Sequence, residues 1–195
     1  MSQRHKTFVS FNHGDETDPN RGEVWKDRFV EMMTEYSQGM VDKSVWDGDI
    51  DTNLSTDEIR RRIREDYLAD STVTVVLIGP CTWARKHVDW EISATLRDTQ
   101  HNPRSGLLGI LLPTHSDYNT GYFNPNLIPR RLVENVGSDI DFAKVYDWSD
   151  DPNQVQDWIH IAFERRNQEP SPTYPTKDLF KNNRPCDQDD PQGWQ

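Results

Sequence analysis

The sequence predicts an α/β fold with a five-stranded, mainly parallel sheet and helices on both of its faces. Short apolar runs alternate with segments of helical period through most of the chain, which is typical of strand–helix–strand units. The runs at 72–78 and 106–112 contain no charged residue, as expected of strands covered on both faces. With 195 residues, the chain is long enough for one domain with a single core.

Each element has its own signal in the sequence. The strands are expected at 6–11, 40–46, 72–78, 106–112 and 143–148, as runs rich in apolar and β-branched residues. Apolar residues at helical spacing predict helices at 24–36, 56–69, from 82 onward, 127–136 and 152–166. Ser55 and Glu58 have the spacing of a capping box, which favours a helix that begins at Thr56.

The chain divides into a domain and a tail. Residues 1–167 form the predicted domain, and residues 168–195 form a Pro- and Asp-rich tail that is expected to be extended or disordered. This composition predicts little contribution to the core. Four apolar residues of the tail could fasten parts of it to the domain or to a partner: Tyr174, Leu179, Phe180 and Trp194.

Composition excludes several classes of partner. The net charge of −11 argues against nucleic acid and anionic membranes, which select clustered cations. No signal peptide and no apolar run of membrane-spanning length is visible, so a cytoplasmic protein is expected. Cys81 and Cys186 lie far apart without metal-ligand spacing, which predicts neither a disulfide framework nor a zinc site.

Glu91 is the main candidate for chemistry. It lies on the helix that follows the apolar strand 72–78 and the Gly79-Pro80 break. In open α/β sheets, ligands bind outside the carboxyl ends of the strands, so a carboxylate on this helix can face a ligand crevice. His87 precedes Glu91 by one helical turn and Trp83 precedes His87 by another, which places all three on one helix face.

A structural alternative accounts for the same pattern. The helix could be ordinary and amphipathic, with Trp90 and Ile92 toward the sheet and Glu91 on the surface. The helical pattern alone favours this alternative.

Two further segments could form walls of a crevice around Glu91. Phe11, Asn12, His13 and Asp15 follow the first strand, where amide, imidazole and carboxylate groups could hold ribose or amide functions. The alternative is a polar connection capped by Asp15. Trp46, at the end of the second strand, is a third candidate wall and could equally belong to the core.

Several chemistries lack their motifs. The sequence contains neither a GxGxxG nor a GxxxxGK[ST] phosphate-binding loop, and it has no GxSxG nucleophile elbow. A response-regulator-like domain shares the strand–helix alternation, but it requires acidic residues after the first strand and a phosphoacceptor Asp after the third. These positions hold Asn12-His13 and Gly79-Pro80-Cys81.

Three segments of the chain resemble the TIR-like family of bacterial defence, the type that includes the TIR proteins of the Thoeris anti-phage system. They are KTFVSFNHGD at the start, TVTVVLIGPCTWARKHVDWEI in the middle and AKVYDWSDDPNQVQDWIHIAFERR at the end. Together they frame residues 6–166. The middle segment is the most specific, because a V-L-I-G strand followed by a D-W-E-I step is unusual by chance.

The resemblance implies a TIR/flavodoxin-like fold with a cleft that binds NAD as substrate, with no cofactor and no metal. Catalytic TIR domains cleave the nicotinamide–ribose bond with a glutamate that corresponds to Glu91. Thoeris-type members convert the ADP-ribose part into a cyclic or otherwise modified signal nucleotide, which activates a separate effector. A phage-derived trigger and self-assembly are further expectations. Many TIR domains have a Trp where this chain has His87.

Two other functional classes remain open at the level of sequence. A TIR-like adaptor would bind other TIR surfaces or a phage trigger without turnover. A nucleotide sensor would bind an NAD-like ligand and change its assembly. Glu91 separates the enzyme from the adaptor, because a binding module has no need of a carboxylate in the crevice.

Overall fold

The computed structural model describes residues 3–12, 25–41, 45, 49–99, 103–137, 139–172 and 178–186, with the backbone alone at Met40 and Val41. Five strands form one sheet in the order β2-β1-β3-β4-β5. Every neighbouring pair is parallel. The strands are β1 (Lys6–Ser10), β2 (Gly39–Val41), β3 (Val73–Ile78), β4 (Gly106–Leu111) and β5 (Ala143–Asp147).

The predicted fold class is confirmed, and the first, third, fourth and fifth strands lie within one residue of their predicted bounds. The first and third strands are direct neighbours, with Ser10 opposite Val76. The second strand is shorter than the predicted 40–46, and residues 42–44 and 46–48 lie outside the described part of the chain. The order 2-1-3-4-5 reverses direction between β1 and β3, and a ligand crevice is expected at such a switch point.

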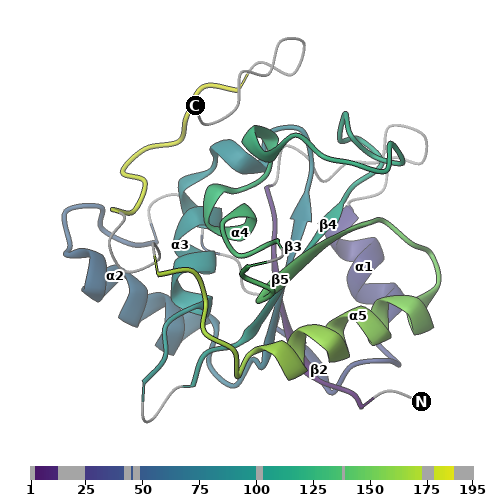
Figure 1. Cartoon of the computed structure of the whole chain (residues 1–195). Helices are drawn as coiled ribbons and strands as arrows, with labels where there is room; N and C mark the ends of the chain where they lie inside the picture. The colour runs from purple at the N-terminus through teal and green to yellow at the C-terminus, as the bar shows by residue number, and fades with distance from the viewer. Residues whose placement is uncertain are drawn as a thin grey trace.

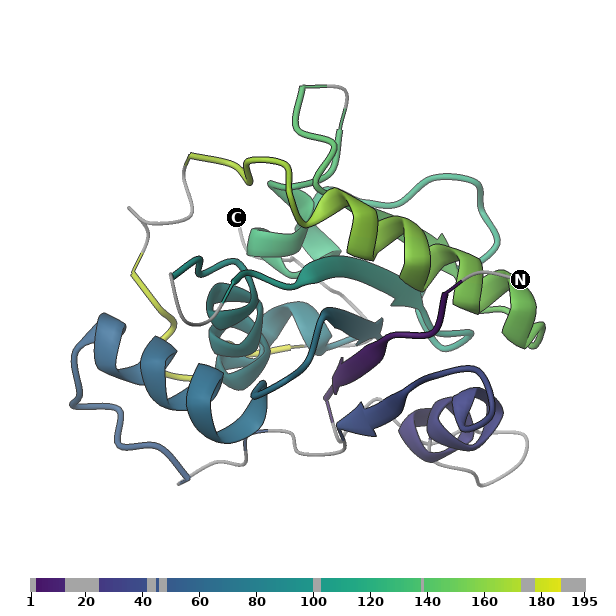
Figure 2. The same ribbon diagram turned by 90° about the horizontal axis from the view of Figure 1, so that it is seen from below.

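Helices cover both faces of the sheet (Figures 1 and 2). One layer consists of α1 (Trp25–Met33) and α5 (Pro152–Arg165), and the other of α2 (Thr56–Arg62), α3 (Lys86–Thr95) and the short α4 (Arg130–Val133). Two 3-10 helices, η3 (Thr82–Ala84) and η4 (Pro125–Leu127), precede α3 and α4. Seen from below in Figure 2, the sheet separates the two layers.

The core consists of apolar clusters on the two faces of the sheet. Under α1 and α5, alternate strand residues such as Val9, Val75 and Leu108 pack with Phe29 and Ile159. On the other face, one cluster joins β3 and β4 to α3 and α4, and another joins Phe8 of β1 to α2 and α3. Every residue of β3 and β4 is buried, as their apolar sequences predict.

The N-cap bond of the predicted capping box is present at the start of α2. The Ser55 hydroxyl accepts a hydrogen bond from the amide of Glu58 at 3.2 Å, which satisfies one of the free amides of the first turn. The predicted helix 56–69 changes its hydrogen-bond pattern at Ile63 and continues as a π-helical turn to Tyr67.

Gly106 permits a close approach between β4 and α5. A Cβ atom at this position would lie 2.2 Å from the backbone oxygen of Ala162, well inside any permitted contact. The absence of a side chain therefore brings the end of α5 onto the first residue of β4.

The tail corrects two expectations. Leu179 is only 7 % exposed and belongs to the cluster of Phe8, Ile59 and Trp90. It therefore fastens the tail to the domain, as expected, whereas the prediction of little contribution to the core is wrong for this residue. Cys186 forms a disulfide with Cys81 across a sequence separation of 105 residues, which contradicts the prediction that these cysteines form no disulfide framework.

The reason for both corrections is spatial. Residues 178–186 run back beside α2 and α3 to the end of β3 (Figure 1), and a sequence separation does not reveal such a return. Tyr174 and Trp194 lie outside the described residues. Within the described chain, no helix is long and apolar enough to cross a membrane.

Candidate active site

The connection from β3 to α3 sets the position of the candidate catalytic helix. After Ile78, the amide of Gly79 donates to the Thr82 hydroxyl at 3.0 Å, and the residues from Thr82 to Ala84 form a 3-10 turn. Arg85 is extended and precedes the first turn of α3. Trp83 lies in this 3-10 turn, where it packs with Ala84 and Leu127, and not in α3 beside Glu91 as predicted.

Glu91 lies at the centre of the site and is completely buried. The Ser10 hydroxyl at the end of β1 donates to one carboxylate oxygen at 2.5 Å. The backbone amide of Val45 donates to the other oxygen at 2.8 Å. Three separate segments of the chain therefore meet at this carboxyl group, and the surface position of the structural alternative is excluded.

Burial changes the acidity of Glu91. Loss of hydration raises its pKa to about 8, against the opposing effect of the hydrogen bonds from Ser10 and Val45. Both of these partners are neutral, so neither supplies the positive charge that usually accompanies a buried carboxylate. Such shifted acids cluster at functional sites, since they can change charge when a ligand binds.

The location agrees with the topology of the sheet. Ser10 is the last residue of β1, and β1 and β3 are the strands between which the strand order reverses. The Ser10–Glu91 hydrogen bond therefore lies at the carboxyl edge of the switch point, where doubly wound sheets bind their ligands.

His87 and Phe11 are brought together, though in a different way from that predicted. The Nε2 atom of His87 lies 3.1 Å from the carbonyl oxygen of Phe11. The Phe11 ring packs on the opposite face of the sheet with Trp25 and Phe29, so its backbone and not its ring adjoins the helix of Glu91. Asn12 is buried at the end of β1.

Three of the predicted wall residues lie outside the described part of the chain: His13, Asp15 and Trp46. Their place in the site stays a prediction. Among the described residues, no group of three or more His, Cys, Asp or Glu side chains is placed to hold a metal ion.

Sequence reasoning missed the two direct partners of Glu91. The side chains of β1 alternate between the faces of the sheet, with Phe8 toward α2 and α3 and Val9 toward α1 and α5. This alternation places Ser10 on the same face as Phe8, so it could have been predicted to face α3. Val45 contributes a backbone amide, for which the sequence carries no signal.

A second buried carboxylate, Asp89, lies on the same helix. One of its carboxylate oxygens accepts a hydrogen bond from the Arg131 guanidinium at 2.6 Å. The other oxygen accepts from the backbone amide of Phe180 at 3.0 Å. Burial raises the pKa of Asp89, and the Arg131 charge and the Phe180 amide oppose that rise. This carboxylate links α3 to α4 and to the tail.

These features define a class of protein: a TIR-like α/β domain with a buried glutamate on the helix after the third strand. The family described as Thoeris protein ThsB, TIR-like domain, matches residues 8–117. This match covers more than half of the chain and contains Ser10, Val45 and Glu91. The chain belongs to this family, and the membership supports a TIR-type role in defence. Comparison with curated proteins gives no match.

Proposed function

We propose that this protein is an NAD-consuming signalling enzyme of anti-phage defence. It cleaves the bond between nicotinamide and ribose and converts the ADP-ribose part into a cyclic or conjugated signal nucleotide. The observation that carries the proposal is the buried carboxyl group of Glu91, held by Ser10 and Val45 at the switch point of the sheet. Family membership adds the link to defence and to NAD.

The chemistry requires a negative charge near the ribose. When the glycosidic bond breaks, nicotinamide leaves as a neutral molecule and the ribose acquires oxocarbenium character. A carboxylate beside the ribose stabilises this charge, as carboxylates do in glycosidases. The leaving group needs no proton, so one carboxylate is enough. Glu91 fills this role, and it can also orient the ribose hydroxyls and the acceptor.

The raised pKa of Glu91, about 8, fits a carboxyl group that ionises when the substrate binds. In the free protein at neutral pH, the protonated form predominates. The positive charge of a bound nicotinamide ring favours the carboxylate, because opposite charges at close range lower the pKa of an acid. Substrate binding therefore generates the charge that the transition state needs.

The adaptor and sensor alternatives account less well for the site. A surface used only for protein docking does not require an uncompensated carboxyl group in the interior, which costs stability when it ionises. A sensor could use Glu91 to recognise a cationic ring, so it differs from the enzyme only in turnover. Measurement of turnover therefore separates these functions.

The proposed partners follow from the product. NAD is the substrate, a separate effector responds to the signal nucleotide, and a phage-derived trigger and self-assembly control the activity. Nucleic acid and membranes are not among these partners. We place the protein in the cytoplasm, where NAD and the infecting phage are both present.

Release of free nicotinamide is the decisive measurement. Purified protein is incubated with NAD, alone and in lysate of phage-infected cells, and the products are separated by chromatography. We expect nicotinamide and an ADP-ribose-derived nucleotide in at least the triggered sample, and neither with Glu91→Gln. NAD binding without release in both samples would favour the sensor, and absence of binding would favour the adaptor.

A further inference from the structure

The tail segment 178–186, which we call the strap, crosses the outer side of α3. The Phe180 carbonyl accepts from the Trp90 indole at 2.7 Å, and the Asp178 carbonyl accepts from Arg131 at 2.7 Å. Leu179 is buried between these two contacts. The strap therefore adheres to the helix of Glu91 through its backbone as well as through an apolar side chain.

The strap also supplies the cap of α3. Arg85, at the N-cap position, makes no capping hydrogen bond with its side chain. The Asn183 side-chain oxygen accepts instead from the amide of Lys86 at 3.0 Å. The next residue, Arg184, donates its own amide to the Ala84 carbonyl at 2.8 Å. The first turn of the catalytic helix is thus completed by residues about a hundred positions later in the sequence.

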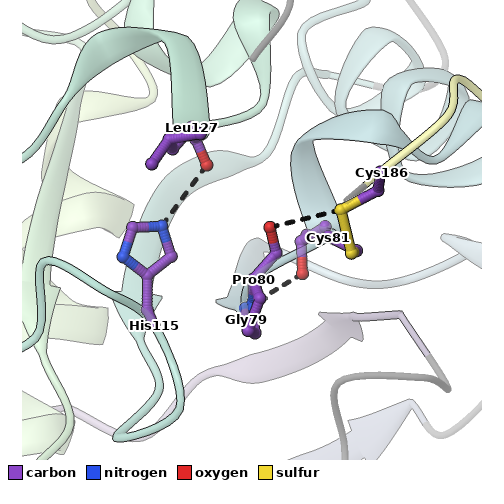
Figure 3. The surroundings of a disulfide bond; sticks show 7 residues. Gly79, Pro80, Cys81, His115, Leu127 and Cys186 are labelled. Carbon is purple, nitrogen blue, oxygen red and sulfur yellow. Dashed lines mark hydrogen bonds between the residues drawn. A yellow bond between two sulfur atoms is a disulfide. The ribbon is translucent and has the colours of Figure 1, made fainter. Parts of the chain in front are cut away.

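The disulfide fixes this cap in place. Cys186 is joined to Cys81, which directly precedes η3 at the end of β3 (Figure 3). Its sulfur lies 3.7 Å from the Pro80 carbonyl oxygen. Cys81 is buried, whereas Cys186 is only partly buried, so an incoming thiolate can reach the Cys186 sulfur more easily.

We propose that the strap is a redox-controlled positioning element that holds α3, and with it Glu91, in place when the Cys81–Cys186 disulfide is closed. In a reducing compartment, disulfides are usually transient and redox-sensing. The claim about activity rests on the proposed NAD cleavage, whereas the claim about the position of α3 does not.

The exchange is chemically balanced. One cysteine thiolate attacks a low-molecular-weight disulfide, forms a mixed disulfide and releases one thiol. The second cysteine thiolate then displaces the other thiol and closes the Cys81–Cys186 bond. A dithiol reverses both steps and is itself oxidised to a disulfide. The closed form is the active one, because it keeps Asn183 at the start of α3.

Amide hydrogen exchange tests the strap without reference to activity. The Lys86 amide reports on the cap, because its acceptor is Asn183. The Val45 amide reports on the catalytic carboxyl, because its acceptor is Glu91. Reduction of the whole protein with a dithiol should accelerate exchange at both amides by about tenfold, the effect of a lost helix cap. Cys186→Ser should behave in the same way and should not respond to the dithiol.

Substitution of the cap separates it from the disulfide. Asn183→Ala should accelerate Lys86 and Val45 exchange while the disulfide stays closed. Asn183→Asp keeps an oxygen acceptor that helix N-termini favour, so it should restore slow exchange. Nicotinamide release should fall several-fold in the reduced protein, in Cys186→Ser and in Asn183→Ala, and should recover in Asn183→Asp.

Unchanged exchange at the Lys86 amide after reduction would overturn the proposal that the disulfide holds the strap on α3. Faster exchange at the Lys86 amide with unchanged exchange at the Val45 amide would overturn the claim that the strap positions Glu91. If the oxidised protein releases no nicotinamide under triggering conditions, the proposed function fails, and the Val45 amide still decides whether the strap positions the site.

Discussion

Two carboxylates on the same helix, Asp89 and Glu91, are both buried but have different surroundings. Asp89 faces α4 and the strap and is paired with the cation of Arg131. Glu91 faces the end of β1 and the backbone amide of Val45, and these two partners are neutral. A compensated buried charge joins structural elements together. A buried charge without an opposite charge beside it costs stability, and such groups cluster at functional sites.

The difference explains why one helix serves two purposes. The side with Asp89 and Trp90 anchors α3 to the strap. The side with Glu91 presents the candidate catalytic group at the switch point. On that side of the helix, burial raises the pKa of Glu91 to about 8.

Asp89→Ala should have the largest effect on stability. It removes the carboxylate that pairs with the buried guanidinium of Arg131, and loss of one member of a buried ion pair typically costs about 3–5 kcal/mol. Thermal unfolding at neutral pH measures this loss. The double variant Asp89→Leu/Arg131→Met removes both charges and should recover much of the stability. A melting temperature unchanged by Asp89→Ala would contradict the contrast drawn between the two carboxylates.

Glu91→Gln should reduce nicotinamide release by roughly a hundredfold or more, since electrostatic stabilisation of this kind contributes several kcal/mol to the transition state. Folding and NAD affinity should change much less. Wild-type turnover in this variant, under triggering conditions, would show that the mechanism is wrong.

The same substitution should stabilise the fold at high pH. The folded-state pKa of Glu91, about 8, exceeds its ordinary value of 4.5, so the protonated carboxyl contributes stability that is present below pH 4.5 and is lost as the pH rises through 8. Gln cannot lose a proton and keeps that contribution. The melting temperature of Glu91→Gln should therefore exceed that of the wild type increasingly from pH 5 to pH 9. A constant difference would contradict the raised pKa.

Leu179→Ala should lower the free energy of unfolding by about 2–3 kcal/mol, the usual result of truncating a buried leucine. For a domain of this size the melting temperature should fall by roughly 5–10 °C. Ile161 is 40 % exposed, and Ile161→Ala is the matched control, with little change expected. Equal effects of the two substitutions would remove Leu179 from the core.

Ser10→Ala should have the smallest effect and should act on the pH profile. The Ser10 hydroxyl lowers the pKa of Glu91, so its removal raises that pKa further. The pH at which kcat/KM for NAD reaches half of its maximum should move upward. Ser10→Thr keeps the hydroxyl and should leave the profile near that of the wild type. A downward shift in Ser10→Ala would mean that the hydroxyl does not favour the carboxylate.

Much of this comparison could be predicted from the sequence. The apolar runs at β3 and β4 predict that these strands are buried, and the alternation of strands and helices predicts the parallel sheet. The position of Glu91 on the helix after a strand end predicts its place in the site. Asp89, in contrast, received no role, because its partners Arg131 and Phe180 lie far along the chain and nothing local indicates a buried ion pair.

The tail shows where sequence reasoning stops. Its polar, proline-rich composition indicates an extended segment, and residues 178–186 contain neither helix nor strand. Composition does not reveal that the carbonyls of an extended segment can accept hydrogen bonds from helix side chains, as Asp178 does from Arg131 and Phe180 does from Trp90. The pairing of Cys81 with Cys186 depends on that docking and was missed with it.

The position of the strap in the sequence sets an order of assembly during synthesis. Ser10, Val45 and Glu91 all emerge from the ribosome well before Asn183. At ordinary rates of translation, the interval between Glu91 and Asn183 is roughly 5–20 s. During that interval the nascent chain already contains the catalytic carboxyl and both of its donors, but α3 lacks its cap. The proposed active centre is therefore completed by a segment that is translated after all the groups that bind its carboxylate.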